Sequence, residues 1–199
     1  MCHGYRVCHR YRTLSALPLV LLALLLGACQ RSHLPEIRHA EAVELERFMG
    51  RWYVIGNIPT VFERGAHNAI EHYALRDDGR IDTTFSFRRD SFDGREREMN
   101  PVATVRDDPS NALWGMQFLW PFKADFRIVH VDEDYRETII GRQKRDYVWI
   151  MARTPTLSEV DYQRLLALLD EEGYDISAIQ RVPQCWQDEC PAGDRTAMP

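Results

Sequence analysis

Five cysteines give this 199-residue chain its widest choice of chemistry, since a thiol can be a nucleophile, a metal ligand, a disulfide partner or a lipid acceptor. Cys29 follows a basic segment and a short apolar run that ends in small residues, "LLLGAC". This is the layout of a secretory signal peptide. The run is too short for a transmembrane helix, which needs about 20 apolar residues. Cleavage after Ala28 would make Cys29 the first residue.

The stretch "LGAC" resembles the lipobox of bacterial lipoproteins. The resemblance implies a signal peptide over 1–28, a lipidated N-terminus and tether over 29–40, and diacylglycerol plus an acyl chain such as palmitate on Cys29. Two or three chains would anchor the protein stably in a membrane. Gln30, which is not aspartate, implies the outer membrane, with the domain on its periplasmic face. The alternatives are an ordinary signal peptide with an accidental cysteine and a retained N-terminal anchor.

After this cleavage the remaining thiols are Cys185 and Cys190, in "CWQDEC". In an oxidising compartment such a pair favours a disulfide, which would pin the C-terminal tail, 184–199. Two free thiols or a metal site are the alternatives. We expect no metal, because no CxxC and no nearby histidine accompany the pair.

Catalytic motifs are missing from the sequence: it has no Gly-x-Ser-x-Gly, His-Glu-x-x-His or Gly-rich phosphate loop. His67, His72 and His130 are scattered and fit ordinary strand positions better than metal or haem ligands. The formal net charge of -5, spread in both signs, argues against nucleic-acid binding. We therefore predict a protein that is not an enzyme and carries no cofactor.

The elements that must position any site are mostly strands. From Gly50 onward, short segments rich in β-branched and aromatic residues alternate with turn signals. Asp-Gly pairs in 76–80 and 92–96 predict type I′ hairpin turns. They would join strands at about 67–77, 80–91 and 95–106.

One late segment has helical spacing instead. Thr156 and Glu159 match a capping box, and Gly173 is placed as a C-cap, which predicts an amphipathic helix over about 157–172. A last strand, "DISAIQRV", follows. The apolar face would consist of Leu157, Val160, Leu165, Leu168 and Leu169. About eight strands and one helix leave a sandwich or a closed up-and-down barrel.

Three stretches decide between these folds by resemblance to the lipocalins. "GRWYVIGNIP" resembles the G-x-W motif through Gly50 and Trp52, "DEDYRETIIG" resembles the second motif with Asp134 and Tyr135, and "MARTP" resembles the third with Arg153. The resemblance is closest to the bacterial outer-membrane lipocalins, relatives of apolipoprotein D. It implies an all-β fold over 41–183: an eight-stranded antiparallel up-and-down barrel, one C-terminal helix packed outside and a short final strand. Arg153 would lie across Trp52 as a structural contact.

A barrel of this size can hold one small ligand. Strand alternation puts one apolar, aromatic set on a common face, which we expect to point inward without any charge. Arg88 or Arg89 could meet a ligand's phosphate or carboxylate at the mouth. The expected ligand-binding residues are Tyr73, Phe85, Phe87, Trp114, Met116, Phe118, Phe126, Ile128, Tyr147 and Trp149. The alternative is that these side chains interdigitate as a filled core.

The resulting functional hypothesis is an outer-membrane-anchored lipocalin that binds a fatty acid or lysophospholipid, for lipid storage, transport or membrane maintenance. The competing hypothesis is a structural or interaction lipoprotein of the cell envelope with an incidental cavity. The family resemblance also allows a homodimer.

Overall fold

The computed structural model describes residue 1 and residues 34–186 of the chain. The predicted lipidation site, Cys29, and the second tail cysteine, Cys190, lie outside the described residues. No helix in the described part is long and apolar enough to cross a membrane.

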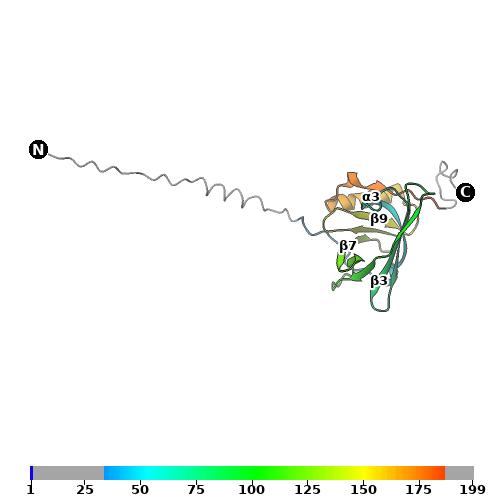
Figure 1. Cartoon of the computed structure of the whole chain (residues 1–199), viewed down its shortest axis with the longest axis horizontal. Coiled ribbons are helices and arrows are strands. Elements are labelled where there is room, and N and C mark those ends of the chain that lie inside the picture. The colour runs from blue at the N-terminus through cyan, green and yellow to red at the C-terminus, as the bar shows by residue number, and fades with distance from the viewer. Residues whose placement is uncertain (2–33, 187–199) are drawn as a thin grey trace. The chain divides into compact units, whose positions relative to one another are not determined.

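Strands build most of the described domain, and they form one antiparallel sheet (Figure 1). In chain order they are β1 (Gly50–Ile58), β2 (Ala66–Leu75), β3 (Arg80–Arg89), β4 (Glu96–Met99), β5 (Val102–Val105), β6 (Leu113–Leu119), β7 (Phe122–Val131), β8 (Glu137–Gly141), β9 (Val148–Ala152) and β10 (Gln180–Arg181). Helices are α2 (Leu45–Phe48), α3 (Glu159–Glu171) and the 3-10 turn η1 (Ile176–Ala178).

The sheet closes on itself because β1 pairs with β2 along one edge and with β9 along the other. Strands β4 and β5 both pair with β3, one after the other along its length, so together they fill a single barrel position. Pro101 separates them, and proline cannot donate a ladder hydrogen bond. The barrel therefore has eight strand positions, and β10 adds to β1 outside it. The predicted eight-stranded antiparallel barrel is confirmed, except that the single strand expected at 95–106 is broken.

Strand β3 shows why the interior is apolar. Ile81, Thr83, Phe85 and Phe87 are all buried, whereas the residues between them are partly or fully exposed. This is the alternation that the sequence predicted, because successive side chains of a strand point to opposite faces.

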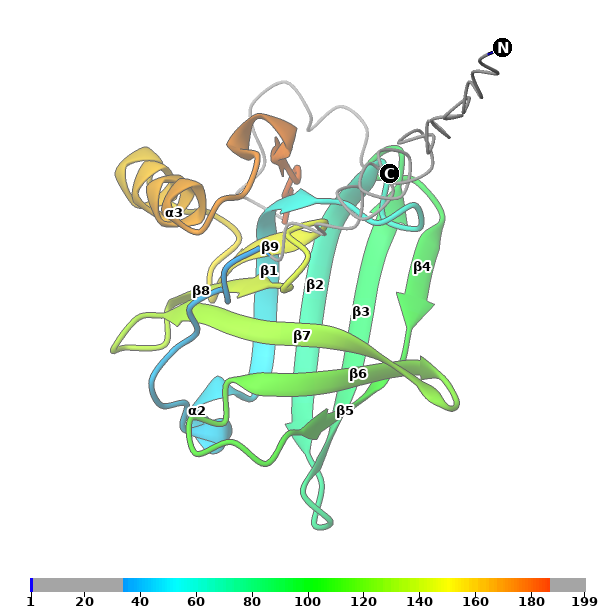
Figure 2. The same ribbon diagram turned by 90° about the vertical axis from the view of Figure 1, so that its left-hand side faces the viewer.

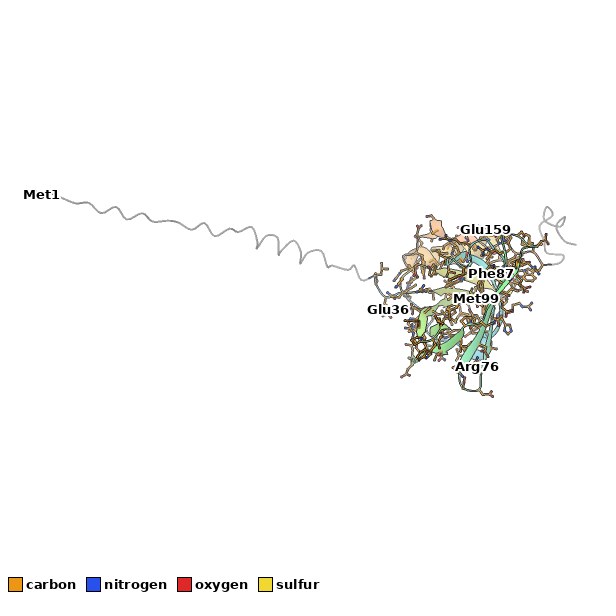
Figure 3. The ribbon with its side chains drawn as sticks, in the orientation of Figure 1. Met1, Glu36, Arg76, Phe87, Met99 and Glu159 are labelled. Atoms are coloured by element: carbon orange, nitrogen blue, oxygen red, sulfur yellow. The ribbon has the colours of Figure 1, made fainter. Side chains whose placement is uncertain are left out.

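The hairpin turns differ from the prediction of type I′ geometry. At the β2–β3 connection Gly79 has a φ of +78°, and Asp78 is not in the left-handed region. The amide of Gly79 donates to the carbonyl of Arg76 at 3.0 Å. The connection is therefore a three-residue hairpin loop that ends in a left-handed glycine. Figure 3 shows Arg76 at the end of this hairpin. At the second Asp-Gly pair, Gly94 lacks a positive φ, so this turn is not type I′ either.

Helix α3 begins later than predicted, and its cap is Ser158 rather than Thr156. The Ser158 hydroxyl accepts from the backbone amide of Asp161 at 3.1 Å and donates to its carboxylate at 2.5 Å. The predicted glycine C-cap is confirmed, since Gly173 has a φ of +81°.

The helix packs on the outside of the barrel (Figure 2). Tyr162, Leu165 and Leu169 are buried in a cluster that includes outward residues of β8 and β9. A Cβ at Gly56 of β1 would lie 2.6 Å from the Tyr162 hydroxyl, so glycine permits this close approach. Val160, which was expected on the apolar face, is 80% exposed because the helix turns that position toward solvent.

The closed end of the barrel is held by Arg153, as the sequence motif implied. Its guanidinium carbon lies 3.7 Å from the centroid of the buried Trp52 ring. It also donates to the backbone carbonyls of Arg51 at 2.8 Å, Arg47 at 2.7 Å and Phe48 at 3.1 Å, and to that of Tyr135 at 3.2 Å. Because the planar guanidinium of Arg153 holds β1, α2 and the turn before β8 together, this contact is structural.

Three other motif residues lie near this end. Tyr135 adopts a φ of +56° in the turn before β8, and its hydroxyl accepts from the amide of Glu44 at 2.8 Å. Asp134 pairs with Arg136 at 3.1 Å. Gly50, with a φ of +92°, starts β1 where the chain enters the barrel.

Candidate ligand-binding cavity

A cavity of about 570 Å³ lies inside the barrel, within the usual size range of small-molecule sites. Its walls come from strands β2, β3, β4, β6, β7, β8 and β9, and from the β1–β2 and β8–β9 loops at its mouth. The lining residues are Thr60, Val61, Phe62, Glu63, Glu71, Tyr73, Thr83, Phe85, Met99, Asn100, Pro101, Met116, Phe118, Ala124, Asp125, Phe126, Ile140, Arg142, Tyr147, Trp149 and Met151.

Seven of the ten residues predicted from alternation line this cavity. They are Tyr73, Phe85, Met116, Phe118, Phe126, Tyr147 and Trp149. The barrel is thus hollow at this level, and the filled-core alternative does not hold there.

Phe87, Trp114 and Ile128 are buried but do not line the cavity, so their prediction as ligand contacts is corrected. Trp114 stacks on Phe126 at 5.0 Å between ring centroids. It also meets Phe48 of α2 edge-on at 5.5 Å, so it belongs to the packed base below the cavity. Alternation predicts which face a residue lies on, but not how far up the barrel the packed base ends.

Large apolar side chains are exposed around the mouth, and we call them the apolar rim. They lie in the β1–β2 loop and at the β6–β7 connection, which the antiparallel topology places at the same end of the barrel. Trp120 is 81% exposed and lies in the turn between β6 and β7, just beyond a register shift in their pairing between Met116 and Leu119. The rim consists of Val61, Phe62, Phe118, Leu119, Trp120 and Phe122.

The expectation of an uncharged interior is wrong. Glu63, Glu71, Asp125 and Arg142 all line the cavity. Each of these charged groups must either be paired or be neutral, since an isolated ion in such surroundings is costly.

Glu63 is buried at the mouth of the cavity, and its carboxylate accepts several hydrogen bonds. Its carboxylate accepts from Thr60 Oγ1 at 2.8 Å, Trp149 Nε1 at 2.8 Å and Asn57 Nδ2 at 3.2 Å. Burial raises the pKa of Glu63, and these hydrogen bonds oppose that shift. The interaction fixes the ring of Trp149 against the cavity wall.

Glu71 is an acid of the cavity wall whose carboxyl group is not fully hydrogen-bonded within the described part of the chain. Its Oε2 atom is buried and has no hydrogen-bond partner among the described residues. Burial, and then the nearby charge of Glu63, raise the pKa of Glu71 well above its ordinary value. Burial thus shifts Glu71 toward the neutral carboxylic acid, which can donate as well as accept.

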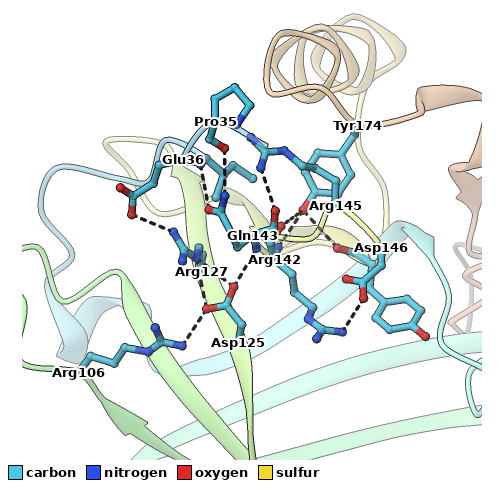
Figure 4. Close-up of polar contacts among 12 residues, drawn as sticks. Pro35, Glu36, Arg106, Asp125, Arg127, Arg142, Gln143, Arg145, Asp146 and Tyr174 are labelled. Carbon is cyan, nitrogen blue, oxygen red and sulfur yellow. Dashed lines mark hydrogen bonds and ion pairs between the residues drawn. The ribbon is translucent and has the colours of Figure 1, made fainter. Parts of the chain in front are cut away.

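Asp125 is fully engaged by its neighbours (Figure 4). It accepts from Arg106 Nη2 at 2.8 Å, Arg127 Nε at 3.0 Å and the backbone amide of Gln143 at 2.8 Å. The side chain of Gln143 bonds the N-terminal segment, since its Nε2 donates to the Pro35 carbonyl at 3.0 Å. This network fixes the start of the β8–β9 loop.

Arg142, the first residue of that loop, keeps part of its donor capacity. Its Nη1 lies 3.3 Å from Asp146 Oδ2 and its guanidinium carbon lies 5.2 Å from the Tyr147 ring centroid. Its Nε is buried without a hydrogen-bond partner in the described part of the chain. The backbone amide of Arg142 donates to the Tyr174 hydroxyl at 2.8 Å, which holds the residue in place. Arg142 can therefore donate a hydrogen bond to an anionic oxygen at the cavity wall.

Arg88 and Arg89, the predicted head-group residues, do not line the cavity. Arg88 donates to the carbonyl of Gly94 at 3.2 Å, and Arg89 pairs with Asp90 at 3.6 Å. Sequence reasoning missed Arg142 because it lies in a loop, where no periodicity places it. The sequence did indicate that Glu71 faces the interior, because Glu71 lies two residues from Tyr73 on the same strand and therefore on the same face.

Cys185 is buried at the end of the described chain. Its amide donates to Asn68 Oδ1 at 2.7 Å, and its carbonyl accepts from Asn68 Nδ2 at 3.0 Å. The pairing of Cys185 with Cys190 stays a prediction, because Cys190 is outside the described residues.

Known proteins resemble both the sequence and the fold. A family model described as a lipocalin-like domain matches residues 43–184. The outer membrane lipoprotein Blc of Citrobacter freundii is 30% identical over 177 residues, 87% of this chain and 98% of that protein. Blc of Escherichia coli K12 is 31% identical over 173 residues, 84% of this chain and 97% of that protein.

Insecticyanin from the tobacco hornworm Manduca sexta has a similar solved structure, with a TM-score of 0.61 over 78% of this chain and 88% of that one. At 14% identity this likeness concerns the fold alone. Because the family model covers the barrel from the segment before β1 to beyond β10, the chain belongs to the lipocalin-like domain family.

Proposed function

We propose that the barrel binds one single-chain anionic amphiphile, a fatty acid or a lysophospholipid, with its chain in the cavity and its head at Arg142. The observation that carries this is the combination of an apolar cavity with a buried, unpartnered Nε–H on Arg142. Among the described lining residues, Arg142 is the one cation. A carboxylate or phosphate would supply the acceptor that this donor lacks.

The hydrocarbon chain of the ligand would supply most of the favourable free energy of binding. Each methylene moved from water into an apolar site contributes about 0.8 kcal/mol, so sixteen carbons would contribute about 12 kcal/mol before other terms. Loss of translational freedom and ordering of the chain offset much of this gain. Micromolar or tighter binding is the expected result.

The apolar rim and the lipid anchor favour a membrane as the source of ligand. Phe62 and Trp120 are 71% and 81% exposed beside the mouth. Exposed apolar patches of this kind mark sites of contact with a lipid surface or a partner. With Cys29 lipidated, the mouth would stay close to a bilayer, and the relatives named Blc are outer membrane lipoproteins. We propose the same location, with a role in lipid storage, transport or membrane maintenance.

Binding, rather than catalysis, fits this site because its polar groups serve recognition and no nucleophile–base pair was identified in the sequence. A homodimer stays a prediction from the family resemblance. The structural-lipoprotein alternative treats the cavity as incidental, so a binding measurement separates the two hypotheses.

The test is titration of the purified domain with hexadecanoate, followed by calorimetry and by the total tryptophan fluorescence, to which Trp149 in the cavity wall contributes. Ala124→Trp should block the cavity from inside, because Ala124 lines it. Ala74→Trp on the exposed face of β2 is the matched control. We expect binding by the wild type and by Ala74→Trp, and loss with Ala124→Trp. If the wild type shows neither heat nor a fluorescence change at tens of micromolar, the structural-lipoprotein hypothesis replaces this one.

A further inference from the structure

Three polar groups on one patch of the cavity wall have no hydrogen-bond partner within the described residues. They are Glu71 Oε2, the Tyr73 hydroxyl and Thr83 Oγ1. All three residues line the cavity, and Tyr73 and Thr83 are 1% and 2% exposed. Buried polar groups are normally hydrogen-bonded, so three neighbouring exceptions call for an explanation.

The strand register places these groups side by side. Glu71 and Tyr73 are two residues apart on β2 and therefore share its inward face. Thr83 on β3 is the cross-strand partner of Tyr73, and Phe85 is the partner of Glu71. Directly opposed side chains in such a pair have Cβ atoms about 4.5–5.5 Å apart. We call Glu71, Tyr73 and Thr83 the polar patch.

The polar patch lies toward the closed end of the cavity. Tyr73 pairs with Gly50, the first residue of β1, where the chain enters the barrel base. The Tyr73 ring packs on Trp114 and on Phe48 of that base, with centroids 5.7 and 5.6 Å apart. Arg142, in contrast, follows β8 at the end of the barrel where the mouth is. A ligand held at Arg142 would direct the far end of its chain toward the polar patch.

A plain methyl end would leave these groups unpaired. An unsatisfied buried hydroxyl or carboxyl costs about 1–3 kcal/mol. A ligand oxygen placed here would gain several donors and acceptors at once, because a hydroxyl both donates and accepts and so does a protonated carboxyl. The site would therefore discriminate by hydrogen bonding, which is more selective than apolar fit.

We propose that the polar patch of Glu71, Tyr73 and Thr83 recognises an uncharged oxygen substituent, a hydroxyl or a ketone, on the distal half of the bound chain. This proposal rests on the proposed function, since it assumes that the head lies at Arg142. It makes the natural ligand an oxygenated single-chain amphiphile rather than a plain fatty acid.

A neutral substituent suits this patch better than an amine. Burial favours the uncharged form of Glu71, and Glu63, the other nearby acid, already accepts three side-chain hydrogen bonds. Binding an ammonium would require Glu71 to lose its proton at a buried position. A hydroxyl or ketone needs no charge at all.

The experiment compares three ligands by calorimetry on the same protein: hexadecanoic acid, 12-hydroxyhexadecanoic acid and 16-hydroxyhexadecanoic acid. We expect at least one hydroxylated acid to bind about tenfold or more tightly than hexadecanoic acid. Thr83→Val, Tyr73→Phe and Glu71→Met should bring that ratio close to one. Glu71→Gln keeps a neutral donor and acceptor and should retain the preference. Thr84→Val, one residue along on the outer face of β3, is the matched control and should also retain it.

The outcomes separate the proposals. If hexadecanoic acid binds and both hydroxylated acids bind equally or more weakly, the oxygen site is refuted while the proposed function stands. If none of the three binds, the proposed function itself fails, and this inference with it. Tighter binding of hexadecylamine, lost in Glu71→Gln, would replace the neutral site with a cation site and overturn the inference.

Discussion

Arg142→Gln tests the assignment of the head-group site. The Arg142 side chain is 19% exposed, so a ligand anion beside it would be largely shielded from water. Hydrogen bonds to charged groups contribute about 1.5–3 kcal/mol, which corresponds to a loss of roughly 10- to 150-fold in affinity for an anionic head. An uncharged head gains no ion pair, so its affinity should respond far less to the substitution.

The assay is a double comparison by calorimetry: wild type and Arg142→Gln, each with hexadecanoate and with 1-hexadecanol. The quantity of interest is the affinity ratio between the acid and the alcohol, which cancels general damage to the cavity. Arg88→Gln is the control, because Arg88 points away from the cavity and bonds the Gly94 carbonyl. We expect the ratio to fall at least tenfold in Arg142→Gln and to stay at the wild-type value in Arg88→Gln.

An unchanged ratio in Arg142→Gln would refute the head-group site, whatever the absolute affinities. A fall in the ratio for Arg88→Gln of similar size would point to a general effect of surface charge, and the specific contact would again be rejected.

Four other predictions follow from the sequence and structure. Arg153→Met should lower the free energy of unfolding by about 3–5 kcal/mol in urea titration, because it removes a cation–π contact and four charge-assisted hydrogen bonds; a loss below about 1 kcal/mol would contradict this. Since burial raises the folded-state pKa of Glu71, stability falls as pH rises above the unfolded pKa of about 4.3, so Glu71→Gln should gain stability over the wild type as the pH is raised from about 4; a difference that stays constant with pH would exclude the shift. Cys29→Ser should release the protein from the membrane fraction, and an unchanged mass and location would exclude lipidation. A free-thiol assay on denatured, unreduced mature protein should find Cys185 and Cys190 unreactive, whereas two reactive thiols would exclude the disulfide.

The barrel could be predicted because its evidence is local and repeated. Inward faces such as Phe85 with Phe87 follow from a two-residue period, and motif residues such as Trp52 with Arg153 identify the base. The helix was also visible, although Ser158 rather than Thr156 caps it: both are good cap residues, and only the path of the chain around the barrel selects one.

The cavity chemistry was harder to predict, for two physical reasons. Depth along the barrel depends on what fills the base, and Trp114 stacks there on Phe126 instead of facing a ligand. The alternation of β6 also stops before the β6–β7 turn that carries the exposed Trp120, because the pairing with β7 shifts register between Met116 and Leu119, and no single-strand pattern reveals such a bulge. Polar wall residues such as Glu71 were overlooked because the inward set was chosen for its apolar character.

Native mass spectrometry of the protein purified from its own membrane is the most direct measurement of lipid binding by the barrel. We predict one bound single-chain amphiphile per wild-type barrel, and none in Ala124→Trp. A wild-type protein that carries no such molecule, or a lipid that remains on Ala124→Trp, would contradict a ligand in the cavity.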